Sequence, residues 1–294
     1  MQLPPELHDH RWLLCTAPLT AEYAGPWSTS GCGRCGTSGR LAAGSLAGVN
    51  HVEYAGAVRA EVLRLADLLS GADPATPVPT CPGWDLAALA GHVGSTHRWV
   101  TAMVGSGTLE KLPFRPFAAG HPADAAALPG WLVEGMERLV TTLVDTPPDR
   151  PGWAWAPPRQ AGFWSRRMLH EIVIHHADAA LAVDSPLAIE PAVAEDGTEE
   201  FLTNLGHAGW VPGAAALDAD GRTIAYQATD TGTTWLVTLG ASTFTWRHAS
   251  GTADVVVSAP TAADLYLAIY GRIAPSAVTG DEDLFARWTA ATPF

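Results

Sequence analysis

The chain has 294 residues, 47% hydrophobic and 16% charged, a composition far from that of disordered proteins and long enough for two ordinary domains. Its 30 acidic residues against 17 basic ones give a formal net charge of −13, which disfavours nucleic acids and anionic membranes as partners. No apolar run reaches the roughly 18 residues of a membrane span, and the first residues lack the pattern of a secretory signal, so we expect a cytoplasmic protein.

Residues 1–50 show no hydrophobic periodicity. We expect a poorly ordered extension, or a start placed too far upstream, with Val49 as the candidate first residue. Cys32 and Cys35 form a Cys-x-x-Cys pair there, and Gly31–Gly36 matches Gly-x-Gly-x-x-Gly. Neither motif follows a strand pattern or leads into a helix pattern, and no second pair of metal ligands is nearby. We therefore expect no redox, zinc or dinucleotide site in this segment.

Four long helices are predicted in the first domain. Apolar residues recur at helical spacing over residues 51–69, 86–104, 128–143 and 162–183, and stretches rich in proline or glycine separate these segments. Asp85 is suited to cap the second helix. Helices of this length joined by loops predict a four-helix bundle over residues 51–188, whose inward positions are a usual place for a metal or ligand.

The periodicity changes beyond Pro191. After a short helix around residues 199–202, four segments alternate as strands do, at residues 223–228, 235–239, 243–247 and 253–257. Two further helices are expected at residues 262–270 and 282–290. The predicted fold class is therefore an all-α bundle followed by a small α+β domain over residues 189–294.

A polar stripe on the fourth helix carries the candidate chemistry. Arg167, Glu171, His175 and Asp178 lie at i, i+4, i+8 and i+11, so they share one helix face. Glu171 and His175 are one turn apart and can bind one metal ion, while Arg167 and Asp178 could orient these ligands or contact a substrate. The zincin motif is excluded, because His170 and His175 are five residues apart instead of four.

A third ligand must come from another helix, since catalytic zinc usually takes three protein ligands and keeps one position open. His92 lies near the same side of the second helix as Leu89 and has small neighbours, so it is the better inward candidate. His97 is expected toward solvent. The alternative is that Glu171 and His175 form an exposed pair and that His92 is a hydrogen-bonded core histidine.

Two motifs resemble those of a known family. The segment VPTCPGWDLAALAGHVG at residues 78–94 and the segment HEIVIHHAD at residues 170–178 are similar to motifs of the mycothiol-dependent maleylpyruvate isomerase family, which has a DinB-like four-helix bundle. In the second domain, ATDTGTTWLV, ADVVV and the segment at residues 270–281 look like the family's C-terminal domain, itself similar to sterol-carrier folds. The resemblance covers residues 50–294.

The resemblance implies a zinc site whose ligands would be His92, Glu171 and His175. Two histidines and one carboxylate leave room for an exogenous thiol, and zinc stabilises the thiolate form of such a ligand. None of the four cysteines lies on the two predicted helices that carry these ligands. We therefore expect the thiol to come from a small cosubstrate, which the resemblance suggests is mycothiol.

Other polar residues are candidates to contact the substrate or the thiol. The resemblance implies that an arginine of the C-terminal domain meets an anionic substrate, and a Gly-Arg motif makes Arg272 the candidate. Arg167 is the second catalytic candidate, and His176 and Asp178 are candidates to bind the thiol cofactor. His176 stands where relatives often carry arginine, a departure that concerns the substrate and not the metal.

The expected function is a zinc- and mycothiol-dependent thiol transferase or cis–trans isomerase that acts on a small electrophile, as a monomer or homodimer. Isomerisation of a dicarboxylate needs cationic side chains to anchor it, and their scarcity favours the broader transferase description. Two alternatives stay open. The same ligands suit Fe(II) chemistry with oxygen, although that triad is usually built on a β-scaffold. The bundle could also be a non-catalytic metal-bearing module whose second domain binds a lipid-like ligand or a protein.

Overall fold

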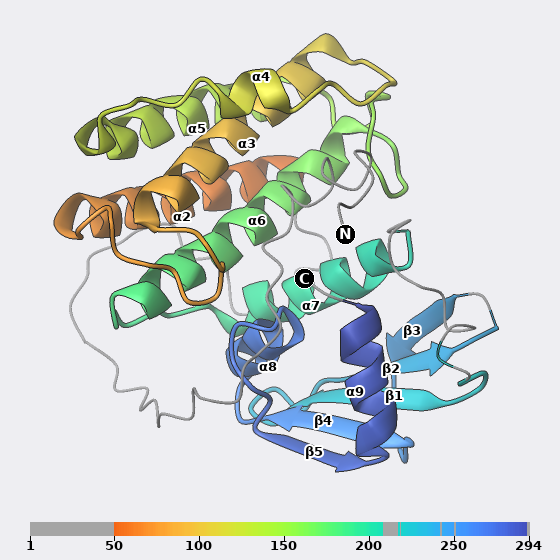
Figure 1. The fold of residues 1–294 in the computed structure, drawn as a ribbon. Helices are drawn as coiled ribbons and strands as arrows, with labels where there is room; N and C mark the ends of the chain where they lie inside the picture. The colour runs from red at the N-terminus through yellow and green to blue at the C-terminus, as the bar shows by residue number, and fades with distance from the viewer. Residues whose placement is uncertain (1–49, 208–216, 218, 242, 250, 293–294) are drawn as a thin grey trace, which may run out of the picture.

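The computed structural model describes residues 50–207, 217, 219–241, 243–249 and 251–292 (Figure 1). The helices are α2 (His51–Gly71), α3 (Leu86–Ser106), α4 (Arg115–Ala118), the 3-10 turn η2 (Ala125–Ala127), α5 (Leu128–Asp145), α6 (Ala161–Ala182), α7 (Pro191–Leu205), α8 (Ala262–Ile269) and α9 (Glu282–Ala291). The strands are β1 (Thr223–Ala228), β2 (Thr234–Leu239), β3 (Phe244–His248), β4 (Val255–Ala259) and β5 (Ala277–Gly280). The motifs of Cys32, Cys35 and the nearby glycines lie outside the described residues.

Side chains at the helix boundaries explain where the bundle helices begin. Asn50 starts α2 with a capping box, in which its side chain accepts hydrogen bonds from the backbone of Val52 and Glu53 while the Glu53 carboxylate accepts from the Asn50 backbone. Asp85 caps α3 by accepting from the backbone N–H of Ala88, as predicted. The four long helices are confirmed, with ends that differ from the prediction by one or two residues.

Helices α2, α3, α5 and α6 pack against one another in the upper part of Figure 1. Their apolar stripes meet in a core that includes Val58 and Leu65, both without exposed surface. Trp99 of α3 and Trp164 of α6 meet edge to face there, with ring centroids 5.3 Å apart. Helix α6 contacts the other three helices and also α7, so residues 167–180 are all buried.

The C-terminal part contains a five-stranded sheet with the strand order β3-β2-β1-β4-β5. Strand β1 pairs antiparallel with β2 and parallel with β4, and the outer strands β3 and β5 are antiparallel to their neighbours. Helices α8 and α9 pack on this sheet. The prediction missed β5, a four-residue strand with no buried side chain and therefore without a hydrophobic alternation. The predicted fold class, a helical part followed by an α+β part, is confirmed.

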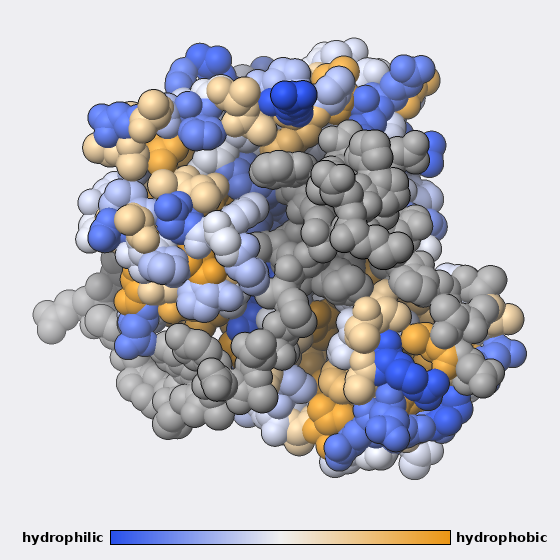
Figure 2. All heavy atoms as spheres, viewed as in Figure 1, coloured by the Kyte–Doolittle hydropathy of each residue, from blue (hydrophilic) through white to orange (hydrophobic). Residues whose placement is uncertain are grey.

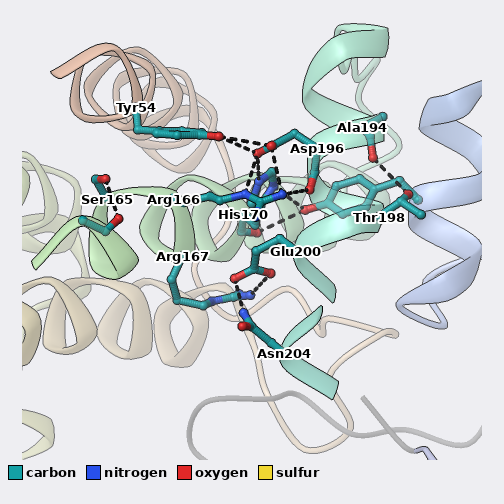
Figure 3. A network of polar contacts seen from close by, with 12 residues as sticks. Tyr54, Ser165, Arg166, Arg167, His170, Ala194, Asp196, Thr198, Glu200 and Asn204 are labelled. Carbon is teal, nitrogen blue, oxygen red and sulfur yellow. Dashed lines mark hydrogen bonds and ion pairs between the residues drawn. The ribbon is translucent and has the colours of Figure 1, made fainter. Parts of the chain in front are cut away.

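Helix α7 lies between the bundle and the sheet and joins them through polar side chains (Figures 1 and 3). Asp196 of α7 accepts hydrogen bonds from the hydroxyl of Tyr54 on α2 and from Nε of Arg166 on α6, each at 3.1 Å. His170 Nε2 lies 2.7 Å from the same carboxylate. Gly197 permits this close approach, because a Cβ at its position would lie 2.8 Å from His170 Nδ1. The junction brings the C-terminal domain against α6.

On the face shown in Figure 2, the hydrophilic residues that are coloured are spread over both parts of the molecule. Four large hydrophobic side chains are exposed in the described residues: Val52 and Leu63 on α2, Leu109 after α3, and Val144 on α5. Within the described part of the chain, no helix combines the length and the apolar character needed to cross a membrane.

Candidate metal centre

The structure brings together the three side chains that the sequence suggests as metal ligands. His92 Nε2 of α3 lies 3.1 Å from Glu171 Oε1, and His175 Nε2 lies 3.3 Å from the same oxygen. The three residues are only 6%, 3% and 3% exposed. The alternative of an exposed Glu171–His175 pair is therefore wrong. The helical spacing of α6 places the last two ligands one turn apart, and the contact of α3 with α6 adds the first.

This donor set fits a zinc ion. With bonds of about 2.0–2.1 Å in a tetrahedral arrangement, the ligand atoms around zinc are about 3.3 Å apart. The separations of 3.1 and 3.3 Å at Glu171 Oε1 match that spacing. The three donor atoms all lie within 4.8 Å of one another. Two imidazole nitrogens and one carboxylate oxygen leave a further position for an exogenous ligand.

Burial and neighbouring charges give the three ligands different proton affinities. Burial lowers the pKa of His92, so its ring is neutral. Burial alone would raise the pKa of Glu171, but hydrogen bonds from His175 and His92 and the charge of Arg167 hold it well below its usual range. Burial also opposes the charged form of His175, yet hydrogen bonds to Asp178 and Glu171 outweigh it and raise the pKa to about 9.

The other two members of the predicted polar stripe contact the ligands. Arg167 Nη2 donates to Glu171 Oε2 at 2.9 Å, the carboxylate oxygen that does not face the histidines. Asp178 Oδ2 lies 2.9 Å from His175 Nδ1, the ring nitrogen that faces away from Glu171. Arg272, from the turn after α8, donates from Nε to Asp178 Oδ1 at 2.9 Å. The predicted contacts of these three residues with substrate or thiol stay predictions.

His176 points in a different direction from His175. Its Nδ1 contacts a carboxylate oxygen of Glu61 on α2, and Arg64 pairs with the other oxygen of that carboxylate. Burial raises the pKa of Glu61, but the hydrogen bond and charge of His176 and of Arg64 bring it below its usual value. The structure thus places His176 in a contact between α2 and α6, and its role in binding the thiol stays a prediction.

His97 is not at the surface, and the expectation that it faces solvent is wrong. Its side chain is fully buried, and burial lowers its pKa to about 3. Helix α3 packs against both α5 and α6, so residues 89–97 are all buried. A single amphipathic stripe cannot describe a helix that is covered on two sides, which is why helical spacing alone misplaced this histidine.

Aromatic rings form apolar walls beside the ligands. The Trp84 ring lies 4.9 Å from the ring of His92 and 6.2 Å from that of His175, between centroids. The Phe114 ring lies 6.4 Å from His92. Sequence reasoning gave these two residues no role, although Trp84 belongs to the Pro-Gly-Trp motif that precedes α3. Apolar walls lower the local polarity and strengthen electrostatic interactions at the site.

A second group of donors, from Cys81, His175 and Asp178, lies next to the first. Cys81 Sγ is 3.4 Å from Asp178 Oδ2. Burial alone would raise the pKa of Asp178, but the charge of Arg272 and the bond to His175 lower it to about 2. Arg272 binds both oxygens of Asp178, whereas Arg167 binds Glu171 at Oε2 and Oε1 faces the two histidines, so His92, Glu171 and His175 are the favoured set.

Comparisons with known proteins agree with this architecture. Residues 55–180 match the family model described as the mycothiol maleylpyruvate isomerase N-terminal domain. Crystal structures of a mycothiol-dependent maleylpyruvate isomerase and of a mutant of that enzyme are similar in fold, each with a TM-score of 0.56 and 16% sequence identity over 81% of this chain and 96% of the other. No curated protein sequence gives a significant match. Residues 55–180 are thus similar to the N-terminal domain that this family model describes, and the fold as a whole is similar to that of a mycothiol-dependent maleylpyruvate isomerase.

Proposed function

We propose that this protein is a zinc-dependent enzyme that joins mycothiol to a small electrophile, by S-transfer or by reversible addition that isomerises the substrate. The observation that carries the proposal is the buried triad of His92, Glu171 and His175, in which both histidine nitrogens lie at a zinc-like spacing of 3.1 and 3.3 Å from Glu171 Oε1. The match of residues 55–180 to the family model and the likeness of the whole fold to a mycothiol-dependent enzyme support the choice of thiol.

A bound zinc ion would supply one chemical effect, a lower pKa for a thiol that joins it, so that the thiolate nucleophile is available near neutral pH. The chain's own residues prepare that position. His92 presents a neutral nitrogen, and Glu171 presents an ionised oxygen. His175 holds a proton in the metal-free chain and must release it to become a ligand. Trp84 and Phe114 restrict water on the α3 side.

The charges around the triad favour S-transfer to a substrate that carries little negative charge. Arg167 pairs with Glu171 and Glu200, Arg272 pairs with Asp178, and His176 pairs with Glu61. In the part of the chain that the structure describes, each cationic candidate is thus already matched by a carboxylate. A dicarboxylate would have to compete for these partners, whereas a neutral electrophile would not.

The test combines metal analysis with turnover. Protein purified without added metal or chelator is expected to contain one zinc per chain and to consume a neutral electrophile, such as a chlorodinitrobenzene, only when mycothiol is present. His175→Ala should lose both the zinc and the activity while keeping its fold. Iron in place of zinc would overturn the proposal in favour of oxygen chemistry. Stoichiometric zinc without thiol-dependent consumption of any electrophile or dicarboxylate isomer would instead indicate a binding module.

A further inference from the structure

The two metal ligands on α6 are each held by a charged partner on the side away from the metal. Glu171 uses Oε1 toward the histidines and accepts from Arg167 Nη2 at Oε2, at 2.9 Å. His175 uses Nε2 toward Glu171 and contacts Asp178 through Nδ1, also at 2.9 Å. Outer partners of this kind fix the tautomer and orientation of a ligand and strengthen its basicity.

Both partners lead to the same turn of the C-terminal domain. Arg167 donates from Nη1 to the hydroxyl of Tyr270 at 3.2 Å and to Glu200 Oε2 at 2.9 Å (Figure 3 shows Arg167 with Glu200). Arg272 binds both oxygens of Asp178, from Nε at 2.9 Å and from Nη2 at 3.3 Å. Tyr270 and Arg272 are two residues apart, so one short segment reaches both α6 ligands, each through one intermediate.

The backbone fixes these two side chains relative to each other. Helix α8 ends in a Schellman motif, in which the N–H of Gly271 bonds to the carbonyl of Ala268 and the N–H of Arg272 bonds to the carbonyl of Leu267. Gly271 has φ +68, a left-handed conformation that glycine adopts without strain. Arg272 Nη1 also donates to the carbonyl of Tyr270 at 2.7 Å. The segment is therefore a rigid cap and not a loose loop.

We propose that the turn Tyr270–Arg272 is a positioning element for the metal centre. It acts on Glu171 through Arg167 and on His175 through Asp178. This proposal rests on the proposed metal-dependent function. It gives Arg272 a different task from the substrate contact that the sequence suggests, and it selects ligand orientation for Arg167, because both guanidinium groups are buried and face carboxylates that they orient. The C-terminal domain thereby sets the geometry of a site whose ligands all come from the bundle.

The chain offers a matched pair of tyrosines for the test. Tyr266 and Tyr270 lie one turn apart at the end of α8, both are buried, and both place a hydroxyl 3.2 Å from a side chain of α6. Tyr270 reaches Arg167, which contacts a metal ligand. Tyr266 reaches Nδ1 of His170, which contacts Asp196 through its other nitrogen and is not a ligand. Removing either hydroxyl costs a similar buried hydrogen bond. Only the removal at Tyr270 disturbs a series of contacts that ends at the metal centre.

The decisive experiment measures zinc affinity by competition with a chromogenic chelator for the wild type, Tyr266→Phe and Tyr270→Phe. We expect both variants to lower the melting temperature of the metal-free protein by similar amounts. Only Tyr270→Phe should weaken zinc binding, by about threefold to tenfold, less than the tenfold to hundredfold typical of a direct outer partner. The visible absorption of the Co²⁺-loaded protein should change in Tyr270→Phe and stay unchanged in Tyr266→Phe.

Two variants of Arg272 test the contact of the turn with Asp178, because they should weaken zinc binding to different degrees. Arg272→Gln removes the charge beside Asp178 and should weaken zinc binding by about tenfold or more. Arg272→Lys keeps the charge but loses the bidentate contact with Asp178, so its zinc affinity should lie between those of Arg272→Gln and the wild type. If Arg272→Gln does not fold, Arg272→Lys and the tyrosine pair still decide the question.

The outcomes separate the positioning role from the proposed function. Zinc binding by the wild type, with equal affinities in Tyr266→Phe and Tyr270→Phe, would overturn the positioning role and leave the metal-dependent function standing. A wild type that binds no zinc would overturn both. Weaker zinc binding in Tyr270→Phe alone, together with the altered Co²⁺ spectrum, is the result that supports the positioning role.

Discussion

The two sides of the candidate metal centre are built differently. On the α6 side, Glu171 and His175 each have a charged outer partner, and both partners are held by the C-terminal domain. On the α3 side, His92 has no hydrogen-bond partner for Nδ1 within the described residues, and its ring packs against those of Trp84 and Phe114. The contrast shows that one ligand is placed by apolar packing and the other two by a network of charges.

This difference also sets the proton affinities of the two histidines. Apolar surroundings keep His92 neutral, so it is ready to bind a metal. The carboxylates beside His175 raise its pKa to about 9, so it is a more basic ligand that must first release a proton. A metal ion that binds at the triad therefore takes the place of a proton on the α6 side only.

The largest expected effect comes from removing a ligand. His92→Ala or His175→Ala should abolish stoichiometric zinc and weaken binding by more than the roughly hundredfold loss that an outer partner causes. His97→Leu is the matched control, because it changes an equally buried histidine of α3 that is not a ligand. Elemental analysis and a chelator competition give the readout. Full zinc occupancy in a folded His92→Ala protein would contradict the assignment of the site.

The next effect comes from the outer partner of His175. Asp178→Asn removes the charge that orients the ring and makes it basic, so zinc affinity should fall about tenfold to hundredfold. No change of similar kind can be made behind His92, whose Nδ1 has no hydrogen-bond partner among the described residues. Isothermal titration of the metal-free variant with zinc measures the loss. An affinity equal to that of the wild type would show that the charge of Asp178 does not strengthen His175 as a zinc ligand.

The pH dependence of zinc binding also distinguishes His175 from His92. Below a pKa of about 9 the His175 ring carries a proton in the metal-free chain, whereas His92 is neutral and Glu171 is ionised. One proton should therefore leave with each zinc bound, and affinity should fall about tenfold for each pH unit lost between about pH 8 and pH 6. Titrations in buffers of different ionisation enthalpy count the protons. Release of no proton would mean that His175 is neutral before the metal arrives.

The smallest effect is expected at His176, which neighbours a ligand in sequence but faces α2. His176→Arg places a guanidinium opposite Glu61 and does not alter a residue of the triad. Zinc affinity should change by less than about threefold, because the substituted side chain lies outside the triad. The same chelator competition measures it. A loss comparable to that of Asp178→Asn would place His176 in the metal centre after all.

Local pattern predicted most of the helical domain and singled out the three side chains that the fold brings together as candidate ligands. The spacing of Glu171 and His175 puts them on one helix face, which is a property of five consecutive residues and needs no tertiary information. The small residues around His92 indicated a close helix contact, and the structure shows that contact between α3 and α6. The strand β5 was missed because its side chains are exposed and show no alternation.

Tertiary contacts account for what the sequence could not predict. Arg272 lies 94 residues from its partner Asp178, and Tyr270 lies 103 residues from Arg167. No local spacing relates such residues, so their ion pairs and hydrogen bonds are visible only in the folded chain. The burial of His97 has the same origin, because it depends on helices packed on two sides of α3. The sequence pattern suggested the three candidate ligands, and the fold shows which residues hold their side chains.

Whether the metal centre binds and activates a thiol is tested by the absorption spectrum of the Co²⁺-loaded protein during titration with mycothiol. The account predicts an intense near-ultraviolet band from sulfur bonded to the metal, which saturates at one thiol per chain and is absent in His175→Ala. A protein that binds Co²⁺ at the triad yet shows no such band at any mycothiol concentration would contradict the claim that this metal centre activates the thiol.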